Sequence, residues 1–145
     1  MEQYKKSIIH KINYLTSEMN GLYHQLSQKL GMSDSVSIVL YSIYDAGGEC
    51  LLGDIQKNSG ISKQTIHSAV QGLVKDGRLR LEQHNGKAKK VSFTPKGRDY
   101  AEKTVARIYE AEINSFSRWP EEKVEEYLKL MEQYAESFRQ EMEKI

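Results

Sequence analysis

The sequence predicts a mainly α-helical protein with one small β-hairpin, for three reasons. Apolar residues recur at steps of three and four along most of the 145 residues, which is the spacing of amphipathic helices. One stretch alternates apolar and polar side chains with period two on both sides of an Asn-Gly pair, as hairpins do. Serines and glycines stand where the helical patterns begin and end.

The composition limits the class of protein. With 39% hydrophobic and 28% charged residues, the chain has enough apolar material for a core and does not resemble a disordered or disulfide-rich protein. No apolar run approaches the ~20 residues that span a bilayer, so we expect no membrane anchor, no signal peptide and a cytoplasmic location. The single cysteine, Cys50, fits a reducing compartment, and we interpret it as a small buried residue in preference to a redox sensor.

The first element is a long helix within residues 1–31. Its apolar residues alternate at steps of four and three, which is the seam of a helix that packs lengthwise against other helices. The helix is expected to end at Gly31. The seam consists of Ile8, Ile12, Leu15, Met19, Leu22 and Leu26.

The next segment, residues 33–98, has the organisation of a compact lobe. Ser33 can cap a second helix, "DSVSIVLYSIYDA", which stops at Gly47. A short extended stretch and a compact helix over 52–58 follow. Ser62 can then cap a helix over about 62–76, which closes at Gly77.

The helix over 62–76 is predicted to read DNA. Ile66, Val70, Leu73 and Val74 form its buried stripe, so short polar side chains face outward. Two short helices joined by a glycine turn, with a polar second helix, are what a helix-turn-helix requires. Glutamine, lysine, serine and threonine can all bond to base edges, although an exposed helix lacking acids is the plainer alternative. The predicted contacts are Ser62, Lys63, Gln64, Thr65, His67, Ser68 and Gln71.

A basic hairpin, or wing, over about 79–94 favours the DNA interpretation. The strands "RLRLEQ" and "KVSFT" flank Asn85-Gly86, which predicts a type I′ turn. Residues 54–98 carry a net charge of +7, against −1 before them and −5 after them. The residues expected to reach phosphates are Asn85, Gly86, Lys87, Lys89 and Lys90.

The order of elements resembles the MarR family of bacterial transcription regulators, on "SKQTIHSAVQGLVKDGRL" and "FTPKGRDYAEK". The resemblance implies a winged helix-turn-helix, an obligate homodimer on palindromic operators, usually a repressor, often released by a small aromatic or other effector. Two features depart from the family pattern. The wing lacks the Asp-x-Arg arginine, which favours phosphate contact over minor-groove reading, and Ser68 stands where members often carry arginine.

The C-terminal segment, residues 99–145, is expected to complete a dimerisation domain with the first helix. One helix runs past Lys96 to Phe116, Pro120 restarts the chain, and the last helix carries a second seam. Intramolecular packing of these seams is the alternative to a second copy of the chain. The predicted interface contains Ile8, Ile12, Leu15, Met19, Val124, Leu128, Met131 and Phe138.

The family resemblance implies an effector pocket at the junction of this dimer arm and the lobe, although tyrosines at helical spacing are more often core or interface. We expect no catalytic residues, no metal site and no cofactor, because no nucleophile or metal-ligand constellation is present. The alternative to a DNA-binding regulator is a winged-helix protein-interaction adaptor, which would not need the basic middle segment. The pocket candidates are Tyr14, Tyr23, His24, Tyr41, Tyr44 and Tyr100.

Overall fold

The computed structural model describes all residues, Met1–Ile145, and divides the chain into two compact units, Met1–Ile108 and Tyr109–Ile145. Its elements are helical apart from one three-stranded antiparallel sheet, so the predicted fold class is confirmed. No helix combines the length and the apolar character that crossing a membrane requires.

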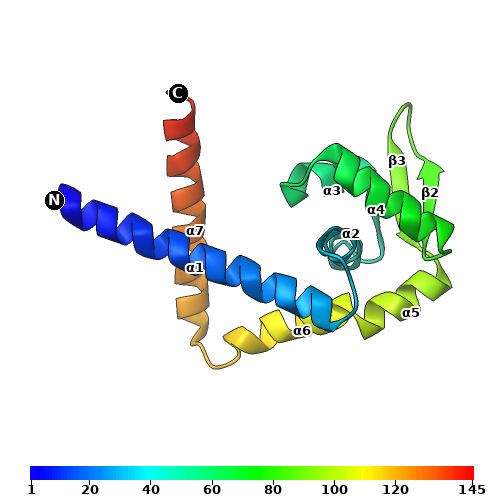
Figure 1. Cartoon of the computed structure of the whole chain (residues 1–145), viewed down its shortest axis with the longest axis horizontal. Helices are drawn as coiled ribbons and strands as arrows, with labels where there is room; N and C mark the ends of the chain where they lie inside the picture. Colours follow the sequence, from blue (N-terminus) through cyan, green and yellow to red (C-terminus); the bar gives the residue numbers. More distant parts are fainter. The chain divides into compact units, whose positions relative to one another are not determined.

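The first unit contains most of the elements. In Figure 1, α2 lies at the centre of its lobe between α4 and α5, and it also contacts α1 and α3. The elements are α1 (Glu2–Lys29), α2 (Asp34–Asp45), β1 (Glu49–Leu51), α3 (Leu52–Ser59), α4 (Lys63–Lys75), β2 (Leu79–Gln83), β3 (Lys89–Phe93), α5 (Pro95–Lys103) and the start of α6 (Val105–Phe116).

The core of the first unit is formed by side chains from nearly all these elements. The predicted buried stripe of the helix over 62–76 is confirmed, because Ile66 and Val70 are fully buried and Leu73 is 2% exposed. Burying each such side chain stabilises the fold by ~1.5–3 kcal/mol relative to leaving it in water. The core consists of Met32, Val39, Leu40, Ile43, Ile55, Ile66, Ala69, Val70, Leu73, Leu79, Val91, Ala101, Val105 and Ile108.

The predicted helix caps are also confirmed. Ser33 Oγ accepts a hydrogen bond from Val36 N at 3.3 Å, and Ser62 Oγ accepts one from Thr65 N at 3.2 Å. Gly77 follows α4 with φ +73°, a conformation that glycine adopts without steric cost. Local sequence signals therefore set the ends of the two helices that matter most for the site.

The turn of the hairpin differs from the prediction. A type I′ turn needs positive φ at both central residues, but only Gly86 has it, at +56°, and Asn85 does not. His84 N donates to Ala88 O and Ala88 N donates to Asn85 O, both at 2.9 Å, so the strands end earlier and leave a longer loop. The type I′ prediction is wrong because this loop reverses the chain with one left-handed residue.

The predicted two-stranded hairpin is part of a larger sheet. β1 pairs antiparallel with β3, which places Cys50 opposite Val91 and gives the strand order β1–β3–β2. The extended Cys50-Leu51 stretch is too short to show the alternation of apolar and polar residues by which a strand is recognised. Its pairing with β3 is a long-range contact that only the folded lobe supplies.

The single helix expected from Lys96 to Phe116 is broken at Thr104, which is a second correction. Thr104 has φ −124° and ψ −87° and is buried. Its hydroxyl donates to Tyr100 O at 2.7 Å, and its N–H donates to Ala101 O at 3.2 Å. These two bonds satisfy the buried polar atoms of Thr104 while the helix is interrupted.

The second unit consists of the end of α6, a turn and α7 (Glu121–Met142). Trp119 packs edge-on against Phe116, with ring centroids 5.1 Å apart, and against Tyr127 at 5.8 Å. Pro120 occupies the N-cap position of α7, in agreement with the predicted restart of the chain. No residue of α7 is buried.

Candidate nucleic-acid interface

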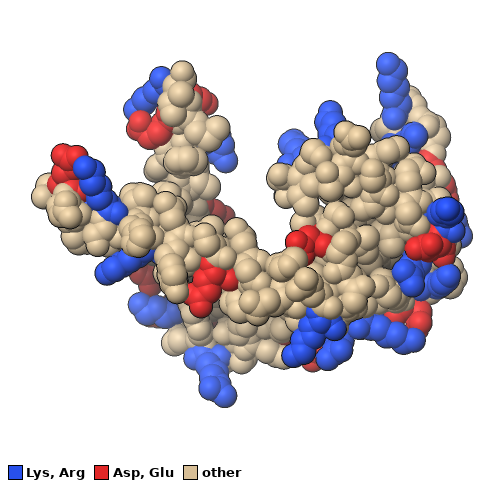
Figure 2. Space-filling view, viewed as in Figure 1, with Lys and Arg blue, Asp and Glu red and all other residues tan.

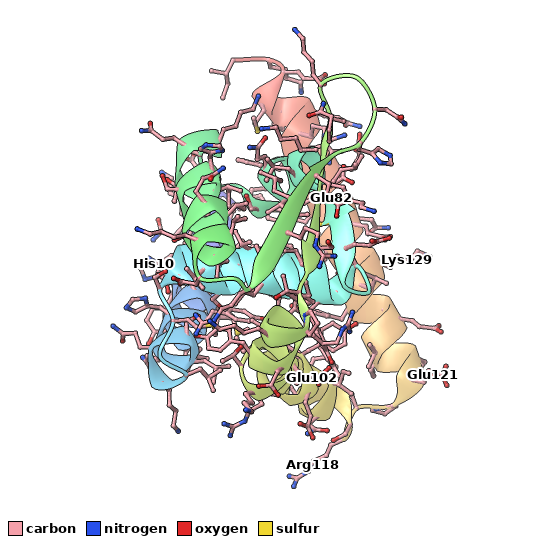
Figure 3. All side chains as sticks on the ribbon, turned by 90° about the vertical axis from the view of Figure 1, so that its right-hand side faces the viewer. His10, Glu82, Glu102, Arg118, Glu121 and Lys129 are labelled. Atoms are coloured by element: carbon pink, nitrogen blue, oxygen red, sulfur yellow. The ribbon has the colours of Figure 1, made fainter.

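The exposed side of α4 is polar along its first two turns. All seven side chains that the sequence singled out here are exposed, and no acidic residue occurs on the helix before Asp76. Thr65 also belongs to the cap, because its hydroxyl lies 2.8 Å from Ser62 Oγ. In Figure 3, α4 and the hairpin of β2 and β3 lie side by side, with Glu82 labelled on the hairpin.

The polar side chains of α4 divide into two groups by position. Gln64, Thr65 and Ser68 line a cleft between α4 and the beginning of α2. Lys63, His67 and Gln71 are exposed and do not line that cleft. The second group follows a spacing of four residues and therefore forms one stripe along the helix.

The wing lysines differ in their surroundings. Lys90 is half-buried and its Nζ lies 3.5 Å from Glu49 Oε2, so an ion pair already engages it. Lys87 and Lys89, nearer the tip, are exposed. Lys87 and Lys89 are therefore better placed than Lys90 to contact a phosphate.

Basic side chains project from several sides of the lobe, including the side that carries the start of α4 and the wing. Figure 2 shows Lys and Arg projecting from the edge that carries α3, the start of α4 and the wing tip. A local positive field of this kind attracts polyanions even though the whole chain has a net charge of only +1.

The step between β3 and α5 holds the C-terminal end of α4. Thr94 Oγ1 donates to Gly77 O at 2.5 Å, and Lys96 Nζ donates to Asp76 O at 2.8 Å. Gly97 lies so close to Arg78 that a Cβ atom on it would be 1.7 Å from Arg78 O. These contacts fix α4 against α5 and the sheet, which gives the polar face of α4 a rigid support.

A model of the MarR family matches residues 30–89, which include α2, α3, α4, β2 and the wing tip. This part of the chain is similar to the MarR family. Solved structures of MarR-family proteins share the fold of this chain. No curated protein matches the sequence.

Three MarR-family structures illustrate the likeness. NMB1585 from Neisseria meningitidis has a TM-score of 0.83 at 14% identity and covers 94% of this chain and 96% of its own. A regulator from Silicibacter pomeroyi has a TM-score of 0.68 at 18% identity, with 88% and 86% covered. BpsR from Bordetella bronchiseptica, whose DNA binding is regulated by 6-hydroxynicotinic acid, has a TM-score of 0.63 at 18% identity, with 86% and 98% covered. At these identities the likeness shows the MarR-family fold.

The six residues predicted for an effector pocket occupy different surroundings in the structure. Tyr41, Tyr44 and Tyr100 are half-buried and pack against the core of the lobe. Tyr14 is 66% exposed on α1, whereas His24 Nδ1 lies 2.8 Å from Asp34 Oδ2. Of the six, Tyr100 lines the cleft beside α4.

Cys50 lies half-buried in β1 against the core. Burial first, and the negative charge of Asp54 second, raise its pKa to about 11. The thiol is therefore neutral near pH 7, whereas the thiolate is the reactive form. This environment favours the interpretation of Cys50 as a small packing residue. No group of three or more His, Cys, Asp or Glu side chains is arranged to hold a metal ion.

Sequence reasoning missed Arg78 and Gly72 as residues of the cleft. Arg78 and Arg80 alternate with leucines in "RLRL", which indicates two similar outward side chains. In the structure, Arg80 is exposed, whereas the Arg78 side chain is only 29% exposed and its guanidinium carbon lies 3.8 Å from the centre of the Tyr100 ring. No local pattern distinguishes the two arginines, because Tyr100 comes from α5.

Proposed function

We propose that this chain is a homodimeric, sequence-specific DNA-binding regulator that acts as a repressor on palindromic operators and is released by a small-molecule effector. The observation that carries the proposal is the exposed, acid-free polar face of α4 beside a basic wing. A protein-interaction adaptor with the same fold has no need for either feature.

In the proposed complex, α4 enters the major groove and the wing contacts the DNA backbone. Gln64 can bond bidentately to adenine, and Lys63 can bond to guanine. Lys87 and Lys89 neutralise phosphates, which adds affinity without sequence information. This division is supported because Lys63 and Gln64 are held on a helix, whereas Lys87 lies in the loop of the wing and Lys89 begins β3 beside it.

The proposed dimer buries apolar faces that the single chain leaves exposed. On α1, Leu15 is 57% exposed and Met19 51%, and on α7, Leu128 is 57% exposed and Met131 53%. Exposed apolar residues in an ordered row are typical of an interface. A two-fold dimer presents two copies of α4, which suits half-sites about 34–36 Å apart.

The proposed effector response draws its support from structural neighbours. The DNA binding of BpsR is regulated by 6-hydroxynicotinic acid, and RdhR is described as an organohalide-sensing regulator. For this chain, the tyrosines named above remain the predicted binding region. An effector weakens DNA binding only if it binds more tightly to the form that does not fit the operator.

The test is selection of bound sequences from random duplex DNA by the full chain. We expect an inverted repeat whose half-sites are about one helical turn apart. Recovery of no preferred sequence would support the adaptor instead. Recovery of a single, non-repeated site would contradict the dimeric mode of binding.

Two variants then separate base reading from backbone contact. Gln64→Ala should cost ~1–3 kcal/mol on the selected operator and little on random DNA, because only the operator presents the matching base. Lys87→Ala should weaken binding to both DNAs alike and reduce the slope of its salt dependence by about one. Equal losses on both DNAs from Gln64→Ala would contradict base reading by this residue.

A further inference from the structure

The loop of the wing contains an Asn-Gly pair, Asn85-Gly86, that the rest of the lobe leaves open to solvent. Both residues are exposed, and in Figure 1 the loop between β2 and β3 projects beyond the rest of its lobe. No atom lies within 4 Å of the position that a Cβ on Gly86 would occupy. Asparagine is one of the chemically labile residues, and a following residue without a Cβ leaves its side-chain amide open to attack by the next backbone nitrogen.

The hydrogen bonds of this loop hold its carbonyls and leave the two reactive groups free. Ala88 N donates to Asn85 O at 2.9 Å, and Gln83 Nε2 donates to Gly86 O. Neither the side-chain amide of Asn85 nor the N–H of Gly86 makes a hydrogen bond within the chain. The groups that must meet for a ring to close are therefore not held apart by other partners.

The chain carries the same pair of residues a second time, in a different backbone setting. Asn20-Gly21 lies well inside α1. Each backbone N–H in a helix donates to the carbonyl four residues earlier, so the nitrogen of Gly21 is engaged. Ring closure at this pair requires local opening of α1, which costs free energy. The wing pair needs no such opening.

We propose that Asn85 is a site of spontaneous deamidation, which converts a neutral amide of the wing to a carboxylate. The backbone nitrogen of Gly86 loses its proton and attacks Asn85 Cγ, so that a new N–C bond forms and the side-chain nitrogen leaves as ammonia. A succinimide ring results. Water then opens the ring at either carbonyl, which gives aspartate or isoaspartate. The reaction consumes one water molecule, releases one ammonia and needs no oxidant.

The new carboxylate lies among the groups that are expected to contact phosphates. Asn85 is itself one of them, and the exposed Lys87 follows two residues later. A negative charge here is repelled by DNA phosphates and offsets a lysine of the wing. The affinity for DNA should therefore fall as a molecule ages. This consequence rests on the proposed function, whereas the deamidation itself does not.

The first test compares the two Asn-Gly pairs within the full chain. The protein is incubated for several days at mildly alkaline pH, and peptide mapping by mass spectrometry then measures the fraction of aspartate and isoaspartate at each pair. We expect conversion at Asn85 and retention of asparagine at Asn20, because α1 holds its pair in a helix. In guanidinium chloride, which unfolds both settings, the difference between the two pairs should close.

The second test measures the effect on DNA binding. Asn85→Asp, which reproduces one product, should weaken binding ~3–10-fold on the selected operator and on random DNA alike, and should reduce the slope of the salt dependence by about one. Incubated wild-type protein should lose affinity in the same way. Asn85→Gln is the control, because its longer side chain closes a ring much more slowly. An incubated sample of this variant should bind DNA as tightly as its own fresh sample.

Three results would overturn the proposal: retention of asparagine at position 85, equal conversion of the two pairs in the folded protein, or a difference that persists in guanidinium chloride. Undiminished DNA binding by fully converted wild-type protein would contradict the effect on the wing. If fresh protein binds no DNA, the proposed function fails, while peptide mapping still decides whether Asn85 deamidates.

Discussion

The helices α4 and α7 carry the same spacing of apolar residues, but the chain treats them differently. In α4, Ile66 and Val70 are fully buried by α2 and the sheet. In α7, Leu128 and Phe138 are both 57% exposed, and no residue of that helix is buried. A helical stripe thus predicts that a face will be covered and does not identify the covering surface. For α4 that surface belongs to the same chain, and for α7 we propose a second copy.

The largest expected effect comes from placing charges on the exposed stripe of α7. Leu128→Asp combined with Met131→Asp should give monomers or insoluble protein in light scattering, because two charges cannot be buried in an apolar interface without partners. Lys129→Asp, on the same helix outside the seam, is the control and should remain dimeric. A wild-type protein that is monomeric at micromolar concentration would contradict the proposed dimer.

Truncating one leucine in the lobe and one in α7 should distinguish burial within one chain from burial between two chains. Leu40→Ala removes a fully buried side chain of α2 and should lower the free energy of unfolding by ~2–5 kcal/mol at every protein concentration. Leu128→Ala should cost less than about 0.5 kcal/mol where the protein is dilute and more where dimers form. Urea unfolding over a range of protein concentrations measures both. Equal costs at the lowest concentration would mean that α7 packs within its own chain.

Close packing inside the lobe should make Gly97 intolerant of a side chain. Gly97→Ala places Cβ against Arg78 O, so we expect a loss of ~1–3 kcal/mol in thermal or urea unfolding. Gly53→Ala provides the comparison, because no atom lies within 4 Å of its added carbon. If Gly97→Ala leaves the free energy of unfolding unchanged, the backbone between β3 and α5 must shift readily to make room for the methyl group.

The smallest effect should have the opposite sign. Gly72→Ala adds a methyl group to the exposed side of α4, where nothing is in contact, and should stabilise the lobe by about 0.5–1 kcal/mol. Melting temperature and urea midpoint measure this change. A destabilised variant would argue against open space beside Gly72.

The features that the sequence predicted correctly depend on neighbouring residues. Ser33 and Ser62 cap helices through bonds to residues three positions later, and the exposure of His67 and Gln71 follows from the helical period of α4. Each of these signals depends only on residues a few positions apart in the sequence. They were sufficient to predict the helix-turn-helix, the wing and the side chains on the exposed face.

The features that the sequence did not predict depend on distant residues. The break at Thr104 reflects the burial of a hydroxyl, and no glycine or proline marks it. Cys50 joins a sheet only because β3 offers it an edge. The position of Arg78 follows from Tyr100, 22 residues further along the sequence. The cleft therefore became visible only when α2, α4 and α5 were placed together.

The hydrogen bonds that Thr94 and Lys96 donate to the residues at the end of α4 also affect the order in which the chain folds during its synthesis. A ribosome releases the chain from its N-terminus, so α4 emerges before either of these partners. β3, the middle strand of the sheet, likewise emerges from the ribosome after α4. The match to the family model ends at residue 89, where β3 begins. Until Lys96 has emerged, the carbonyl of Asp76, the C-cap residue of α4, must bond to water. A nascent chain therefore completes the support of α4 only after synthesis has passed into α5, shortly before the apolar residues of α6 appear.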